Sequence, residues 1–207
     1  MVEEHKLLYN WTLYYHIDSQ SDNYVSSYKK ATSFDTCEGW ARVFNNVPDA
    51  GVLTSSNCEI HCENQKVIAY SIFKDDIKPL WEDKRNESGC EWGCRQELNT
   101  DYVTEVWRHL VASMVCGELD ILGARVVNKN TVTRNITKIE VWLGEEHDPA
   151  ETYSNLQNVI TSLNLGHENP NFQLIHHDIR NKETSDFNEK RKRKKRYDKY
   201  RIRDIYN

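Results

Sequence analysis

The sequence lacks the long apolar segments that a membrane protein needs. No uninterrupted apolar run approaches the ~20 residues that a helix requires to cross a bilayer. The opening residues, MVEEHK, are too acidic for a secretory signal peptide. We therefore expect no membrane association and a cytoplasmic location. Nuclear import is left open by the basic tail described below.

Sequence signatures of catalysis are missing as well. The chain contains no G-x-S-x-G, H-E-x-x-H, G-x-G-x-x-G or G-x4-G-K-[ST] motif. Asp75, Asp76, Glu82 and Asp83 form an acidic stretch that would suit a metal-dependent hydrolase, but such a stretch is more often a solvated loop. We therefore expect a protein that is not an enzyme and that uses no cofactor.

Six cysteines are present, and four of them form two C-x3-C pairs, Cys58 with Cys62 and Cys90 with Cys94. This spacing is compatible with structural zinc, and His61 could add a ligand. No glycine-rich knuckle follows either pair, and a domain of 207 residues folds without metal. The sequence favours unpaired thiols and no metal, with a zinc protein as the weaker alternative.

The charge is distributed unevenly along the chain. Residues 190–207 hold ten of the 27 Lys and Arg residues and two of the 32 acidic ones, so they carry +8 and the remainder carries −13. The length fits one large domain. We predict a domain over residues 1–180 and a basic tail over residues 181–207, which is either disordered or in contact with RNA.

Hydrophobic periodicity indicates interleaved strands and helices. Alternation with a period of two predicts strands at residues 11–17, 67–73, 123–128, 136–143 and 172–177. A period of 3.6 predicts helices from Thr36 to Pro48, over 101–116, and from Pro149 to near Gly166. The pattern predicts an antiparallel sheet covered on one face by three helices.

The segment from Phe73 to Asp83 carries the clearest functional signal. It follows a predicted strand and contains Pro79, so it should form a loop that displays Trp81 and Glu82. An exposed tryptophan beside a carboxylate suits a ligand-binding site, although an isolated pair of this kind more often has its tryptophan in the core.

The wider pattern resembles the eukaryotic translation initiation factor 4E family, whose members bind the 7-methylguanosine cap of messenger RNA. The resemblance covers about residues 5–178. Its motifs, in order along the chain, are His5-x-Leu7-x-x-x-Trp11, Phe34-Asp35-Thr36-x-Glu38, Phe73–Asp83, Gly89-x-x-Trp92, Gly117-Glu118, Gly123-Ala124 and Lys138-Ile139-x-Val141-Trp142.

The resemblance implies an α+β fold, with a curved antiparallel sheet of about eight strands backed by three helices on its convex face. It also implies a mode of cap binding. Tyr24 and Trp81 would sandwich the cationic base by stacking and cation–π attraction. Glu82 would accept hydrogen bonds from guanine N1–H and N2–H. Trp142 would contact the N7-methyl group.

The phosphates of the cap would meet Lys138 and one further cation. Counting without gaps from Gly123 assigns that role to Lys129, but the following segment is longer than usual in the family, which leaves Arg134 as an alternative. Glu91 stands where the family usually has a basic residue, which implies reduced affinity for the triphosphate or compensation by the tail.

A second surface is implied for protein partners, a scaffold initiation factor (4G-like) or a 4E-binding protein. The matching positions are His5, Leu7, Cys37 and Ala41. The family has an exposed Trp where this chain has Ala41, so the resemblance does not favour recognition of a standard scaffold peptide. We expect Trp107 to fill the core rather than to replace that anchor.

We therefore expect a monomer that binds capped messenger RNA in translation initiation. Two alternatives stay open. Tyr24 resembles the second class of the family, whose members often repress translation, so the protein could bind the cap without recruiting the scaffold. Tyr24 and Glu91 together would also fit a protein-interaction module that has lost cap binding.

Overall fold

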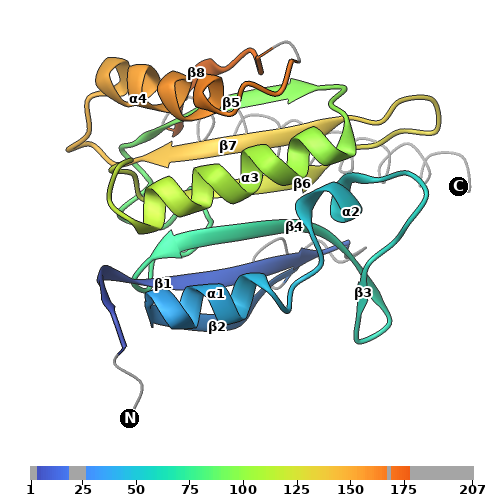
Figure 1. Ribbon diagram of the computed structural model, residues 1–207, viewed down its shortest axis with the longest axis horizontal. Coiled ribbons are helices and arrows are strands. Elements are labelled where there is room, and N and C mark those ends of the chain that lie inside the picture. Colours follow the sequence, from blue (N-terminus) through green and yellow to red (C-terminus); the bar gives the residue numbers. More distant parts are fainter. Residues whose placement is uncertain (1–3, 19–26, 167–168, 178–207) are drawn as a thin grey trace, which may run out of the picture.

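The computed structural model describes residues 4–18, 27–166 and 169–177, which form one antiparallel sheet with helices on a single face (Figure 1). The strands are β1 (Lys6–Ile17), β2 (Tyr28–Thr36), β3 (His61–Cys62), β4 (Gln65–Lys74), β5 (Cys90–Gln96), β6 (Gly123–Asn128), β7 (Thr137–Leu143) and β8 (Gln173–His176). The helices are α1 (Cys37–Phe44), α2 (Ala50–Thr54), α3 (Thr100–Val115) and α4 (Pro149–Ser162). No helix in these ranges is long and apolar enough to span a membrane.

The strand order in the sheet is β2-β1-β4-β6-β7-β5-β8, and β3 pairs with β4 at the side. Every pairing is antiparallel. The predicted α+β class and eight-stranded sheet are confirmed. The described residues contain four helices rather than three, because the five-residue α2 is too short to leave a helical period in the sequence.

The helix starts follow from capping side chains. The Thr36 hydroxyl accepts a hydrogen bond from the Gly39 N–H at 3.0 Å, as expected for the cap of α1. The Asp148 carboxylate accepts from the Ala150 N–H at 2.8 Å, with Pro149 in the first turn of α4. This helix ends at Ser162, one turn earlier than predicted.

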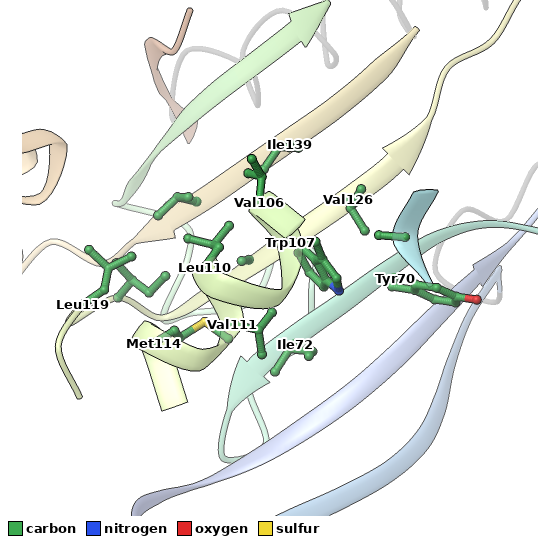
Figure 2. Close-up of a cluster of buried hydrophobic side chains, with 14 of the residues drawn as sticks. Tyr70, Ile72, Val106, Trp107, Leu110, Val111, Met114, Leu119, Val126 and Ile139 are labelled. Atoms are coloured by element: carbon green, nitrogen blue, oxygen red, sulfur yellow. The ribbon is translucent and has the colours of Figure 1, made fainter. Parts of the chain in front are cut away.

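The main core lies between the helices and the sheet (Figure 2). The helix α3 supplies most of its apolar side chains, and the indole ring of Trp107, only 4% exposed, packs between the helix and the sheet. Trp107 therefore fills the core, as predicted from its helical spacing. Facing side chains come from the strands, among them Tyr70, Ile72, Val126 and Ile139.

A second, smaller cluster lies on the opposite face of the sheet. Successive side chains of a strand point to opposite faces, so in β7 Val141 joins the main core while Trp142 joins this second cluster. We call it the Trp142 cluster. Its buried members are Tyr14, Phe73, Ile77, Leu122 and Trp142.

Candidate functional site

The loop between β4 and β5, residues 75–89, carries Trp81 and Glu82, and we call it the Trp81 loop. Asn86 is fully buried at its centre and donates hydrogen bonds to the carbonyls of Lys78 and Leu80, both at 2.8 Å. These bonds fix the backbone immediately before Trp81. Asn86 was not identified from the sequence, because its role depends on contacts six and eight residues away.

The loop exposes Trp81 and Glu82, the two predicted residues, to different extents. Trp81 is half-buried and packs against the Trp142 cluster, while Glu82 is exposed. Ile77 and Leu80, at 4% and 7% exposure, anchor the loop on either side of Pro79. Trp81 therefore lies at the Trp142 cluster, on the face of the sheet opposite the main core, and the exposed Glu82 is its neighbour in the chain.

Trp142 is a buried member of the cluster against which Trp81 packs. It is fully buried, and its ring lies edge-on to Phe73 with centroids 5.4 Å apart and tilted to His177 at 4.6 Å. Its indole N–H donates to the Glu140 carboxylate at 3.3 Å. The structure therefore brings Trp81 and Trp142, 61 residues apart in sequence, into contact with one apolar cluster.

Beside Trp142 lies a group of charged residues that we call the Lys138 cluster, in which Glu91, Arg125 and Glu140 are buried and Lys138 is partly buried. The Lys138 ammonium group lies 3.2 Å from the Glu91 carboxylate and also pairs with Glu140. Arg125 pairs with Glu140 at 2.9 Å. The cation predicted to bind phosphate is therefore paired with two carboxylates that are almost completely buried.

His177 links this cluster to the Trp81 loop. Its side chain is fully buried, its Nδ1 lies 2.6 Å from the Asn86 carbonyl, and its Nε2 lies 3.6 Å from the Glu91 carboxylate. No sequence pattern indicated a role for this residue, because its partners lie about 90 residues earlier in the chain.

The two alternatives for a second phosphate-binding cation lie in different places. Lys129 directly follows β6 and lines the same pocket as Lys138. Its pKa is lowered, chiefly by desolvation and then by the positive charge of Arg125. Arg134 lies in the loop between β6 and β7, where its guanidinium is 3.5 Å from the Glu97 carboxylate. The geometry thus associates Lys129, rather than Arg134, with Lys138.

Tyr24 lies outside the described residues, but Ser27 and Tyr28, which begin the next described segment, contact His16 on β1. The Ser27 hydroxyl is 2.6 Å from His16 Nε2, and Tyr28 stacks on the His16 ring with centroids 4.2 Å apart. The Tyr28 hydroxyl also accepts a hydrogen bond from Arg125. Burial, together with the charges of Arg125 and Lys129, lowers the pKa of His16 to about 4, so the ring is neutral at pH 7.

A family model for eukaryotic initiation factor 4E matches residues 6–192. The chain belongs to this family. Among its relatives, Drosophila melanogaster eukaryotic translation initiation factor 4E1 is 25% identical over 189 residues, 88% of this chain and 66% of that protein. Human eukaryotic translation initiation factor 4E is 28% identical over 151 residues, 69% of this chain and 62% of that protein. The match thus spans less than two thirds of each relative.

Solved structures of initiation factor 4E proteins share the fold. The complex of C. elegans eIF4E-3 with the 4E-binding protein Mextli and cap analog aligns with a TM-score of 0.67 at 21% identity, over 86% of this chain and 96% of that one. Ascaris suum eIF4E-3 with m7G cap aligns with a TM-score of 0.65 at 20% identity, over 84% of this chain and 92% of that one.

In this member of the initiation factor 4E family, the four predicted partner-binding residues gather around the start of α1. The His5 ring nitrogen Nδ1 lies 2.7 Å from the Glu38 carboxylate, and hydrogen bonds from His5 lower the pKa of Glu38 to about 2. Leu7 is half-buried, and Cys37 and Ala41 are exposed on successive turns of the helix.

Ala41 borders a groove of about 390 Å³ between α1 and α3. Trp40 and Phe44 supply its apolar wall, with ring centroids 5.6 Å apart. Arg108 and His109 supply its polar wall from α3. The surface is therefore a groove with one apolar and one polar side, where Arg108 pairs with Asp49 and Glu105, rather than a site with a protruding tryptophan.

The cysteine pairs do not form a metal site in the described ranges, which contain no group of three or more possible ligands. Cys90 and Cys94 lie four residues apart on one strand, about 13 Å at the rise of a β-strand, too far for one zinc ion. Burial raises the pKa of both thiols to about 11, so they are protonated at neutral pH.

Proposed function

We propose that this protein binds the 7-methylguanosine cap of messenger RNA and acts in translation initiation. The observation that supports the proposal is the packing of Trp81 against the cluster that contains Trp142, with the exposed Glu82 next to Trp81 in the chain. Membership of the initiation factor 4E family supports it, as do the related folds solved with m7G cap and with a cap analog.

In the proposed complex, the base lies against the indole ring of Trp81, with Tyr24 on its other face. Methylation at N7 makes the base cationic, so cation–π attraction adds to stacking, which contributes about 1–3 kcal/mol per base. The exposed Glu82 carboxylate accepts hydrogen bonds from N1–H and N2–H, donors that adenine cannot supply in this arrangement. The predicted contact of Trp142 with the methyl group requires the side chains that cover it to move, because Trp142 is fully buried in this structure.

The phosphates of the cap extend from this base site toward Lys138 and Lys129, and Arg134 is the more distant alternative. Because Glu91 and Glu140 already pair with Lys138, its ammonium group offers less free charge to an incoming phosphate. We therefore propose that recognition depends more on the base than on the triphosphate.

Titration of tryptophan fluorescence with 7-methyl-GTP, beside unmethylated GTP, tests the proposal. We expect quenching by the methylated nucleotide alone, because only the methylated base is cationic. Equal quenching by both nucleotides would indicate a general nucleotide site. No response to either nucleotide from a folded protein would favour an interaction module that has lost cap binding.

A second candidate function, a repressor that binds the cap without recruiting the scaffold factor, is favoured by the groove beside Ala41. Helix-in-groove recognition depends on apolar anchors, and here α3 contributes Arg108 and His109 to the groove. Capture on immobilised 7-methyl-GTP, followed by addition of a scaffold-derived peptide, distinguishes the two. Retention of the peptide supports an initiation factor, and its absence supports a repressor.

A further inference from the structure

A pocket of about 380 Å³ lies beyond Lys138, where β5, β7 and the segment before β8 meet. Two cations, Arg95 and Lys129, line it with Lys138, and the amide side chains of Gln96, Asn171 and Gln173 complete its polar wall. We call it the Arg95 pocket. None of the motifs that support cap binding includes Arg95.

The strand register places this pocket on the same face as the candidate base site. In the register between β5 and β7, Arg95 lies opposite Lys138, and Glu91 lies opposite Trp142 nearer the other end of the strands. Lys138 and Trp142 are four residues apart, about 13 Å along the strand. A ligand whose base contacts Trp142 therefore reaches the Arg95 pocket only through an extended chain of phosphates.

The balance of charge differs between Lys138 and its neighbours in the pocket. Lys138 is paired with two buried carboxylates, whereas no carboxylate in the described ranges lies within 4 Å of the Arg95 guanidinium or the Lys129 ammonium group. The pKa of Lys129 is lowered by desolvation first, then by Arg125, Lys138 and Arg95, against an opposing effect of Glu140. Positive charge therefore predominates around Lys129, and no carboxylate pairs directly with it in the part of the chain that the structure describes.

The residues that line the pocket also suit the phosphate backbone of a nucleic acid better than a base. Gly93 lines it without a side chain, and a Cβ there would lie 3.4 Å from the Glu91 carboxylate and 3.9 Å from the Lys138 side chain. Among the described residues, no aromatic ring lines it for stacking. Cations and amide N–H groups without an aromatic platform are the usual partners of phosphate oxygens.

We propose that the Arg95 pocket binds the phosphodiester backbone of the nucleotides that follow the cap. This proposal rests on the proposed cap-binding function and extends it from the cap to the RNA chain. Arg95 supplies the contact that distinguishes a capped RNA from a cap nucleotide. The charge of Lys138 is offset by two carboxylates, whereas no carboxylate of the described residues offsets the charge of Arg95.

The test compares 7-methyl-GTP, which carries three phosphates but no RNA, with a capped pentanucleotide RNA on the wild type and Arg95→Gln. We expect Arg95→Gln to weaken binding of the capped RNA by roughly fivefold and to leave 7-methyl-GTP binding unchanged. The slope of log affinity against log salt for the RNA should decrease in magnitude by about 0.7, the value for one phosphate of a single strand. Arg42→Gln, which removes an exposed charge on α1 across the sheet, is the matched control.

The possible failures are distinguishable. Equal reductions for both ligands, or unchanged binding of the capped RNA, would overturn the assignment of the Arg95 pocket while leaving cap binding intact. A folded wild-type protein that binds neither ligand would contradict the proposed function itself, and this proposal with it. Far-ultraviolet circular dichroism of each variant shows that the fold is retained.

Discussion

Glu82 is the residue on which discrimination of guanine depends in the proposed complex. Its carboxylate is exposed beside Trp81 and accepts from two donors of the base. Glu82→Gln removes the charge and replaces one acceptor with a donor. We expect 7-methyl-GTP affinity to fall by about ten- to a hundredfold, since hydrogen bonds to a charged group contribute about 1.5–3 kcal/mol. Fluorescence titration measures the change.

Glu87→Gln is the matched control for this substitution. Glu87 is also exposed and lies in the same loop, five residues further along the chain. The control should keep wild-type affinity, and neither variant should change the unfolding temperature appreciably, because both side chains are at the surface. Wild-type affinity in Glu82→Gln would remove Glu82 from the proposed base site.

His16 makes the stability of the protein depend on pH. Its pKa is about 4 in the folded state and about 6.5 in an unfolded chain, so the unfolded chain binds more protons between these values. Stability is therefore greatest above pH 6.5 and falls as pH decreases through this window. Lowering the pH from 7 to 5 should reduce the free energy of unfolding by about 2 kcal/mol through His16 alone.

His16→Phe tests this interpretation, because it retains an aromatic ring to stack on Tyr28 but cannot be protonated. Urea unfolding at a series of pH values should show a shallower slope for this variant between pH 7 and 5. His61→Gln, at a half-exposed position on β3, serves as the control. A slope equal to that of the wild type in His16→Phe would assign the pH dependence to other groups.

At the scale of elements, the Trp81 loop is held in place by Asn86. Asn86→Ala removes two hydrogen-bond donors and leaves the carbonyls of Lys78 and Leu80 without them. We expect a decrease of about 2 kcal/mol in the free energy of unfolding and weaker binding of 7-methyl-GTP, because the backbone before Trp81 is released. Urea unfolding and fluorescence titration measure the two effects.

Asn46→Ala is the control for Asn86→Ala, since the Asn46 amide donates to the Arg42 carbonyl at an exposed position. It should cost less than about 0.5 kcal/mol and leave ligand binding unchanged. If Asn86→Ala destabilised the protein but kept full affinity, the loop would be held for binding by its apolar anchors Ile77 and Leu80 instead.

The same elements show which parts of the fold were predictable from sequence. The helices α3 and α4 were predicted because one apolar face is buried, which leaves a period of 3.6. The strand β2 was missed because, at the sheet edge, most of its residues are exposed. The strand β5 was missed because residues on both of its faces are buried, so no alternation remains.

The residues of the candidate site also divide into those that could be predicted from the sequence and those that could not. Trp81, Glu82 and Trp142 lie within sequence motifs and were predicted from the resemblance to the family. Arg125 and Glu140 were not, because their pairing arises only from the register between β6 and β7, which places them opposite each other. An ion pair between residues on two different strands leaves no pattern in the sequence of either strand.

At the scale of the whole molecule, the charges of the chain are separated. The region before residue 190 carries −13 and residues 190–207 carry +8. A polyanion such as RNA is repelled by the first region on average, and so it binds only where cations are concentrated. In the proposed complex these places are the Arg95 pocket and the basic tail.

Deletion of residues 190–207 tests the contribution of the tail. The attraction between the tail and a ligand grows with the number of phosphates, so the deletion should weaken binding of capped RNA more than binding of 7-methyl-GTP. Titrations at low and high salt should show a smaller salt slope for the capped RNA, by about 0.7 for each phosphate that the tail neutralises in the wild type. A tail with its basic residues in scrambled order should restore binding, because this attraction does not depend on sequence. Equal weakening for the two ligands would show instead that the tail acts on the base site itself.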